Sequence, residues 1–317
     1  MRVRDLRLLA AAALLCQAVG CNWMREWRDQ AQAPRPGGKL RDEPTDRFVK
    51  FVNLRAEQLQ SVEYENVRMR VSGKGIGIPL SLNLDGNLVA AQPRCFRLYA
   101  QGKIAGTVDL GSNPEQFWVY TGGAGEPMFV YASHRDFETG RAKIPGGLPF
   151  EPDWVMQALG MTKLPEGVPY DIKIDDRERT YVLGWSGKAP NGMALRKEIV
   201  FDGDGATGSR SQIKRHVLRN DDAKRTVIAT AEVRGAESFR AGSDAQGRPL
   251  AGQYPTRLVL KWEEPRFEMD MTLERGTANG PLADDRRAQL FTRPSNLGTP
   301  AIDLAVARFD APTGRPR

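Results

Sequence analysis

Residues 94–136 read RCFRLYAQGKIAGTVDLGSNPEQFWVYTGGAGEPMFVYASHRD, and three turns divide this stretch. The turns contain Gly102, Gly111–Pro114 and Gly122–Gly125, where glycine supplies positive φ and proline and asparagine favour reversals of the chain. The predicted strands between them are Arg94–Gln101, Ile104–Leu110, Glu115–Thr121 and Glu126–Ser133. Connections this short leave no room for a crossover helix, so the pattern predicts an antiparallel meander.

Apolar side chains occupy both phases of these strands. Phe117 and Val119 point to one side of the predicted sheet, whereas Trp118 and Tyr120 point to the other. A sheet with one solvent-exposed face has strands in which apolar and polar residues alternate. The pattern therefore leaves two alternatives: other segments cover both faces, or one face lines an apolar cavity.

The flanking sequence continues as strands with few helices. Amphipathic helices are predicted at Thr45–Gln60, with Thr45 as the N-cap, and at Glu151–Leu159. Further strands are predicted at Val62–Val71, Leu80–Ala90, Thr180–Ser186, Leu195–Phe201, Arg210–Arg219, Thr226–Arg234, Pro255–Glu263 and Phe267–Arg275. The simplest arrangement of about a dozen strands and two helices is one long, curved antiparallel sheet.

The composition excludes several classes of partner. The chain has 317 residues, 40% of them hydrophobic, which is enough for a substantial core. Its net charge of +7 is spread over interleaved acidic and basic residues, without a basic arm. We therefore predict no nucleic-acid partner, and at most a weak attraction to anionic lipid surfaces.

Residue types that carry catalysis or bind metals are sparse. His134 and His216 are the only histidines, and no CxxC or Cys/His cluster occurs. Gly184–Gly187 misses the nucleophile-elbow pattern and is predicted to lie in a turn. Asp202–Gly205 lacks the glutamate of a calcium loop, which favours a hairpin turn. The sequence thus predicts a protein that is not an enzyme, with no catalytic residue, no metal and no cofactor.

Residues 1–20 predict a lipoprotein signal peptide. Basic residues precede an apolar segment, Leu8–Leu15, that is too short to span a bilayer. Ala18–Cys21 resembles a bacterial lipobox, in which the cysteine is lipidated and becomes the first mature residue. We expect Cys21 to carry the lipid anchor. The alternatives are plain cleavage with an incidental cysteine, or a disulfide between Cys21 and Cys95. Residues 21–44 are polar and rich in proline and glycine, which predicts a flexible tether.

Several segments resemble LolA/LolB-like lipoprotein-carrier proteins, particularly forms from planctomycete-type bacteria. The resemblance is carried by Phe96–Leu98, Asp109–Trp118 and Val130–Tyr131, and later by Pro149–Met156 and Leu290–Pro294. It covers residues 45–295 and leaves 296–317 as a C-terminal extension. The resemblance implies a mainly β fold: a strongly curved antiparallel sheet, or half-open β-barrel, with a few helices closing its concave side.

The resemblance also implies a function. The family's cavity binds acyl chains of lipoproteins or related lipids, and its outer-membrane acceptors, unlike its soluble carriers, have a lipid anchor. Cys21 and the following Asn22 therefore imply a protein anchored at the outer membrane and facing the periplasm. Arg68, Arg70, Arg94 and Arg97 all lie on predicted strands where the carriers' cavity arginine could fall.

Two hypotheses follow. In the first, the protein binds acyl chains in an apolar cavity, for lipoprotein sorting or insertion. The predicted cavity residues are Phe96, Leu98, Phe117, Trp118, Val119, Val130, Met269 and Met271. In the second, the sheet packs solid and the protein is a structural or scaffolding lipoprotein that binds other cell-envelope proteins. The discriminating feature is whether the inward side chains meet one another or surround a void.

Overall fold

The computed structural model describes residues 39–73, 81–103, 106–123, 126–142, 152–189, 192–203, 205, 212–243, 247, 249–264 and 266–307. The chain separates into two units, Met1–Arg41 and Asp42–Arg317, and every helix and strand described below belongs to the second. The predicted signal peptide, Cys21 and most of the predicted tether lie outside the described residues.

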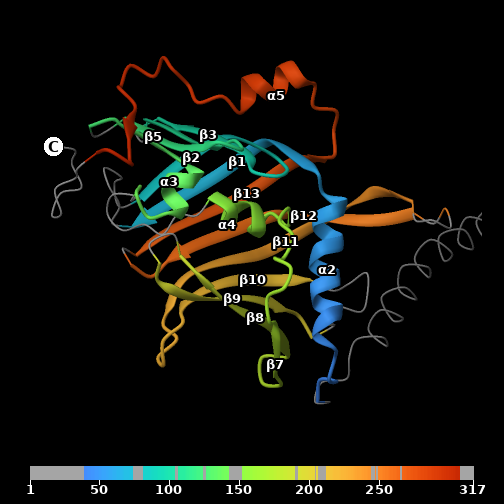
Figure 1. Cartoon of the computed structure of the whole chain (residues 1–317). Helices are drawn as coiled ribbons and strands as arrows, with labels where there is room; N and C mark the ends of the chain where they lie inside the picture. The colour runs from blue at the N-terminus through green and yellow to red at the C-terminus, as the bar shows by residue number, and fades with distance from the viewer. Residues whose placement is uncertain are drawn as a thin grey trace, which may run out of the picture. The chain divides into compact units, whose positions relative to one another are not determined.

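In the described part of the chain, fourteen strands form a single sheet in the order β14-β6-β5-β4-β3-β2-β1-β13-β12-β11-β10-β9-β8-β7. The strands are β1 Ser61–Gly73, β2 Ser81–Ala91, β3 Cys95–Gly102, β4 Gly106–Ser112, β5 Gln116–Gly122, β6 Met128–Ser133, β7 Asp171–Asp175, β8 Thr180–Lys188, β9 Ala194–Phe201, β10 Ile213–Asn220, β11 Val227–Ser243, β12 Pro249–Trp262, β13 Phe267–Ala278 and β14 Ile302–Asp303. Within the described residues, the edge strands β14 and β7 do not pair with each other, so the sheet curves without closing into a barrel (Figure 1). The predicted fold class is confirmed.

The meander predicted from residues 94–136 is also confirmed. Strands β3 to β6 are antiparallel neighbours in chain order, and their registers align Leu98, Leu110, Val119 and Val130 across the sheet. These four apolar side chains therefore share one face. One pairing departs from the antiparallel prediction, because β14 runs parallel to β6.

Four helices accompany the sheet in the described part of the chain: α2 (Thr45–Gln58), α3 (His134–Glu138), α4 (Pro152–Ala158) and α5 (Asp284–Leu290). α2 and α4 lie on one side of the sheet, the inner face, and α5 lies on the other, the outer face (Figure 1). α2 and α4 confirm the two predicted helices. The predicted N-cap at Thr45 is wrong, because Pro44 takes that position without a side-chain hydrogen bond. Proline fixes a suitable φ and brings no N–H that needs a partner.

The outer phase of the meander is covered by the C-terminal part of the chain. Phe291 packs with Val89 and Cys95, which is a free, buried thiol, and Leu297 packs against the group around Trp118. The two apolar phases therefore have two separate covers. On the outer face, other segments cover the apolar side chains, as in the first of the two alternatives predicted from the sequence. This cover, α5 and the chain after it, carries too little hydrophobic periodicity to be predicted, since α5 itself buries no residue.

A buried ion pair links this cover to the sheet. The carboxylate of Asp109, which is 0% exposed, accepts hydrogen bonds from Nε of Arg97 at 3.2 Å, Nη2 of Arg97 at 2.7 Å and the indole Nε1 of Trp118 at 3.1 Å. Arg97 also donates to the carbonyl oxygen of Leu290, at the end of α5, at 3.2 Å. One carboxylate thereby connects three strands and the helix above them.

The elements that the sequence analysis did not predict are short or exposed. They are α3, α5, β7 and β14, together with the outer ends of β11 and β12, which extend past the predicted Thr226–Arg234 and Pro255–Glu263. The added half of β11, Ala236–Ser243, is half-buried or exposed along its length. A strand segment without a buried face has no need of alternating apolar residues, so its periodicity is weak.

We expect Gly111→Ala to lower the free energy of unfolding by about 1–3 kcal/mol, the usual cost of overpacking. A Cβ at position 111 would lie 2.0 Å from Cζ2 of the buried Trp118 ring. Gly187→Ala is the matched control, because Gly187 also lies within a strand and its Cβ would meet no atom within 4 Å. Urea unfolding of both variants measures the difference. Equal stabilities would show that Trp118 can shift aside without cost.

Candidate functional site

The inner face carries one large, continuous apolar cluster. Strands β1 to β3 and β10 to β13 supply most of it, because one phase of each strand is apolar. α4 covers it with Trp154, Val155, Met156 and Ala158. The ring of Trp154 meets that of Trp262 at 5.6 Å between centroids, in an edge-to-face arrangement. The cluster is thus a sheet surface roofed by a helix of seven residues.

The predicted cavity residues divide between three places. Phe96, Leu98, Met269 and Met271 belong to the large inner cluster. The next cluster along the same face contains Phe117 and Val130, with Val119 packed against it. Trp118 lies on the outer face, where its indole group bonds Asp109. The structure therefore brings seven of the eight residues to the inner face, and Trp118 is not part of that surface.

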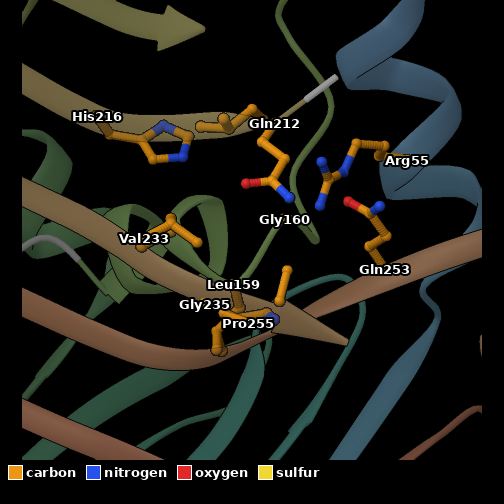
Figure 2. Close-up of a pocket in the computed structure, with 12 residues that line it drawn as sticks. Arg55, Leu159, Gly160, Gln212, His216, Val233, Gly235, Gln253 and Pro255 are labelled. Atoms are coloured by element: carbon orange, nitrogen blue, oxygen red, sulfur yellow. The ribbon is translucent and has the colours of Figure 1, made fainter. Parts of the chain in front are cut away.

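A small cavity of about 20 Å³ lies under α2 (Figure 2). Its walls come from α2, the chain after α4, and strands β10 to β12, and include Arg55, Gly160, His216, Val233 and Pro255. A buried water needs about 10–15 Å³, whereas a cavity that binds benzene measures roughly 150 Å³. In this closed arrangement the cavity has room for about one water molecule, so an acyl chain could enter only if the helices moved.

Among the described residues, two nitrogen atoms beside this cavity are buried and find no hydrogen-bond partner, namely Nε of Arg55 and Nδ1 of His216. Burial, assisted by the nearby charge of Arg55, lowers the pKa of His216 to about 3, so its ring is neutral at pH 7. Burial also lowers the pKa of Arg55 to about 10, and the guanidinium stays charged at pH 7. The site therefore combines one cation with neutral polar groups.

The attachment of α2 to the sheet is one-sided. At its C-terminal end, Nε2 of Gln92 donates to the carbonyl oxygen of Leu59 at 3.0 Å, and Nδ2 of Asn279 donates to that of Gln58 at 2.7 Å. Its N-terminal half rests on aromatic contacts, in which the ring of Phe48 lies 5.2 Å from Tyr181 and 5.0 Å from Phe201. Apolar contacts are non-directional, so this half of the helix is held mainly by burial of side chains such as Phe48 rather than by directional bonds to the sheet.

α2 is also tied to the chain that follows α4. The side-chain oxygen of Asn53 accepts a hydrogen bond from the backbone N–H of Leu164 at 2.8 Å, and Lys163 pairs with Glu57 at 2.8 Å. The second pair is exposed and contributes little by itself. The contacts nevertheless join α2 to the chain that follows α4.

We expect the stability of the protein to fall as the pH is lowered below 6.5. The pKa of His216 is about 3 in the folded protein and 6.5 in the unfolded chain, so the unfolded chain binds the extra proton between these values. The free energy of unfolding should therefore drop by about 1.4 kcal/mol per pH unit from this residue. Urea unfolding at about pH 7 and pH 5 measures this, and His216→Asn should flatten the slope. An unchanged slope in the variant would contradict the assignment.

The other histidine does not form a catalytic pair with its serine neighbour. Nε2 of His134 lies 3.2 Å from the hydroxyl of Ser112 and 2.8 Å from the carbonyl oxygen of Asn113. A carbonyl only accepts, so Nε2 must carry the proton and cannot act as a base toward Ser112. The side chains of His134 and Ser112 are both buried. Gly184–Gly187 lies within β8 rather than in a turn, because both neighbouring strands pair with it.

None of the four arginines considered from the sequence lines the small cavity. Arg68, Arg70 and Arg97 alternate with inward residues and point to the outer face, and Arg94 bonds Glu138 and Asp153 at 2.8 Å each. The arginine that lines this cavity is Arg55, from α2, which was not among the four residues considered from the sequence. A signal for it exists, because Phe48, Val52, Arg55 and Leu59 follow the spacing of a helical apolar stripe.

Two further observations concern metal binding and membrane crossing. No group of three or more metal-ligating side chains occurs among the described residues. In the same part of the chain, no helix combines the length and the hydropathy needed to cross a bilayer.

No protein-family model matches the sequence, and no curated protein matches it. Among solved structures, the fold is similar to a domain from Vibrio parahaemolyticus described as an outer membrane lipoprotein-sorting protein, at 7% identity and a TM-score of 0.46, over 78% of this chain and 98% of that one. It is also similar to a LolA superfamily protein from Nitrosomonas europaea, at 10% identity and a TM-score of 0.45, over 78% and 98%. A DUF1329 family protein from Desulfovibrio piger matches at 10% identity and a TM-score of 0.45, over 78% and 100%. These three similarities concern the fold alone.

Proposed function

We propose that this protein is a lipid-anchored cell-envelope lipoprotein that binds acyl chains of lipids or lipoproteins between the inner face of its sheet and helices α2 and α4. In this proposal Cys21 holds the protein at the outer membrane, residues 22–44 form the tether, residues 45–295 form the binding domain and residues 296–317 extend it. The protein would receive acyl chains during lipoprotein sorting or insertion.

The observation that carries the proposal is the inner face itself. It is a continuous apolar surface, and within the described residues the hydrogen bonds that join α2, one part of its roof, to the sheet lie at the C-terminal end of the helix. Closure also leaves Nε of Arg55, Nδ1 of His216 and Nε1 of Trp154 buried without partners. Each such group destabilises the closed state by about 1–3 kcal/mol, which offsets part of the stabilisation that its apolar contacts provide.

An acyl chain can replace the contacts that opening removes. Each buried CH₂ group contributes about 0.8 kcal/mol, so a chain of about a dozen carbons offsets the loss of helix contacts and the cost of association. No charged partner is needed along the chain, which agrees with an inner cluster made of apolar side chains alone.

The test is displacement of an apolar fluorescent dye from lipid-stripped protein by long-chain fatty acids and by a lipopeptide. We expect saturable displacement at a stoichiometry near one. Native mass spectrometry of protein purified from membranes should also detect co-purified lipid. If the protein binds neither dye nor lipid in both measurements, the proposal is incorrect.

One observation favours a second candidate, a scaffolding lipoprotein that binds a protein partner through its surface. The small cavity measures only about 20 Å³, and the inward side chains meet one another. A solid interior is what a purely structural domain would have. The dye and lipid measurements separate the candidates, because a scaffold has no reason to open its core.

The anchor is tested separately. We expect Cys21→Ser to release the protein from the membrane fraction or to leave an uncleaved precursor, since the serine hydroxyl cannot take the thioether-linked lipid. Fractionation of cell envelopes, with the size and N-terminus of the product determined, measures the outcome. A correctly cleaved Cys21→Ser protein that stays with the membrane would show that another feature anchors it.

A further inference from the structure

We propose that the inner site selects lipids that carry an anionic headgroup, a carboxylate or a phosphate, and that Arg55 binds this headgroup. The inference rests on the proposed function, because it names the chemical class of the ligand that enters the same site. The starting observation is the guanidinium of Arg55, which lies in the wall of the cavity and has no carboxylate partner among the described residues.

The guanidinium of Arg55 is incompletely satisfied. It lies 5.6 Å from the centroid of the Phe51 ring, and Nε is buried without a partner. Among the described residues it has no hydrogen bond or ion pair with a carboxylate. An arginine side chain offers five N–H donors and keeps its charge at any ordinary pH. Arg55 as a whole is half-buried, and a cation that is partly withdrawn from water is stabilised by a paired anion, so this position favours a bound anion.

Two other deeply placed arginines show the usual arrangement. Arg97 pairs with the buried Asp109 at 2.7 Å, and Arg196 pairs with Asp171 at 2.6 Å and with Glu198 at 3.1 Å. Burial alone would lower the pKa of Arg196, but these carboxylates raise it. The pKa of Arg55 is lowered, with burial as its only cause. Arg55 therefore lacks the counter-charge that the fold supplies to Arg97 and Arg196.

The surroundings of Arg55 fit a headgroup with a chain attached. Gln212 and His216 line the same cavity, and Figure 2 shows Gln212 and Arg55 extending into the space between α2 and the strands. None of the described residues that line the cavity carries a carboxylate. Ala158 and Leu159 line it as well, and both belong to the large apolar cluster. A ligand with its charge at Arg55 can thus place its chain on the inner face.

The position of Arg55 on α2 fits the same ligand. It lies in the last turn, next to the end that hydrogen bonds attach to the sheet. When the N-terminal half of the helix separates to admit a chain, this end keeps Arg55 close to the cavity. Arg47, on the first turn, is 53% exposed and pairs with Glu43, so it serves as a control on the same helix.

The experiment compares palmitate with methyl palmitate, which has the same chain without the charge, on the lipid-stripped full chain. We expect palmitate to bind at least about tenfold more tightly, the contribution of one or two charge-assisted hydrogen bonds. Arg55→Met should bring this ratio to about one and keep the affinity for the ester, because only the charged contact is lost. Arg47→Met should leave the ratio unchanged, and Arg55→Lys should keep part of it.

Each contrary result has a distinct meaning. Equal binding of acid and ester to the wild-type protein overturns the headgroup inference and leaves the proposed function standing. Failure of both to bind overturns both. Inorganic phosphate or acetate that competes with palmitate as well as a phosphate-bearing lipid does would show a site for free anions instead. The ratio on the wild-type protein needs no variant, so a poorly folded Arg55→Met does not remove the test.

Discussion

Asp109→Ala is expected to lower the free energy of unfolding by about 3 kcal/mol, because it leaves a mostly buried guanidinium without its counter-charge. Arg97 is 22% exposed and would keep only its hydrogen bond to the carbonyl oxygen of Leu290, and the indole N–H of Trp118 would lose its acceptor. The loss should also loosen α5 from the sheet. Urea unfolding gives the free energy, and hydrogen exchange of residues 284–297 reports the loosening.

The chain contains a matched control for this prediction. Arg257 and Asp270 form a pair with almost the same geometry, 3.1 Å from Nε to Oδ1 and 2.7 Å from Nη2 to Oδ2, but their side chains are 46% and 25% exposed. Solvent screens such a pair, so Asp270→Ala should leave the stability nearly unchanged. Equal losses in the two variants would mean that burial of Asp109 adds nothing to the strength of its pair.

Val119→Glu is expected to weaken binding of a long-chain fatty acid by at least about tenfold, because a carboxylate on the inner face would be buried without a partner when the chain binds. Val119 is a suitable position because it is half-buried, whereas Phe117 and Met271 are 0% and 1% exposed. A charge at either of those positions would unfold the domain before it could test binding. Dye displacement gives the affinity, and thermal unfolding checks that the variant is folded.

Val182→Glu is the control for this second prediction. Val182 is also a half-buried valine on a strand, but it alternates with the inward Tyr181 and Leu183 and so points to the outer face. A carboxylate there should not change the affinity for the fatty acid. If both folded variants bind like the wild-type protein, acyl chains do not use this part of the inner face. If only Val182→Glu weakens binding, the ligand lies on the opposite side of the sheet.

The sequence by itself determined the strands, most turns and the fold class. Alternation along a strand, as in Phe267–Arg275, and turn residues such as Gly122 and Gly123 act within a few residues, so they are visible without the tertiary structure. The same local logic explains why seven of the eight predicted cavity residues lie on one face, because members of one phase stay together, but it did not decide which phase faces inward. It also showed that both faces of the meander are apolar.

Only the tertiary structure decided what covers each face. The outer cover depends on α5 and Leu297, which are far from the meander in sequence and have weak patterns of their own. The tertiary structure also moved Trp118 out of the candidate site, and it placed Arg55 of α2 and His216 of β10 in one cavity wall. Their burial and their charge depend on contacts between distant segments. Local periodicity describes which side a residue faces, but only packing decides what it meets there.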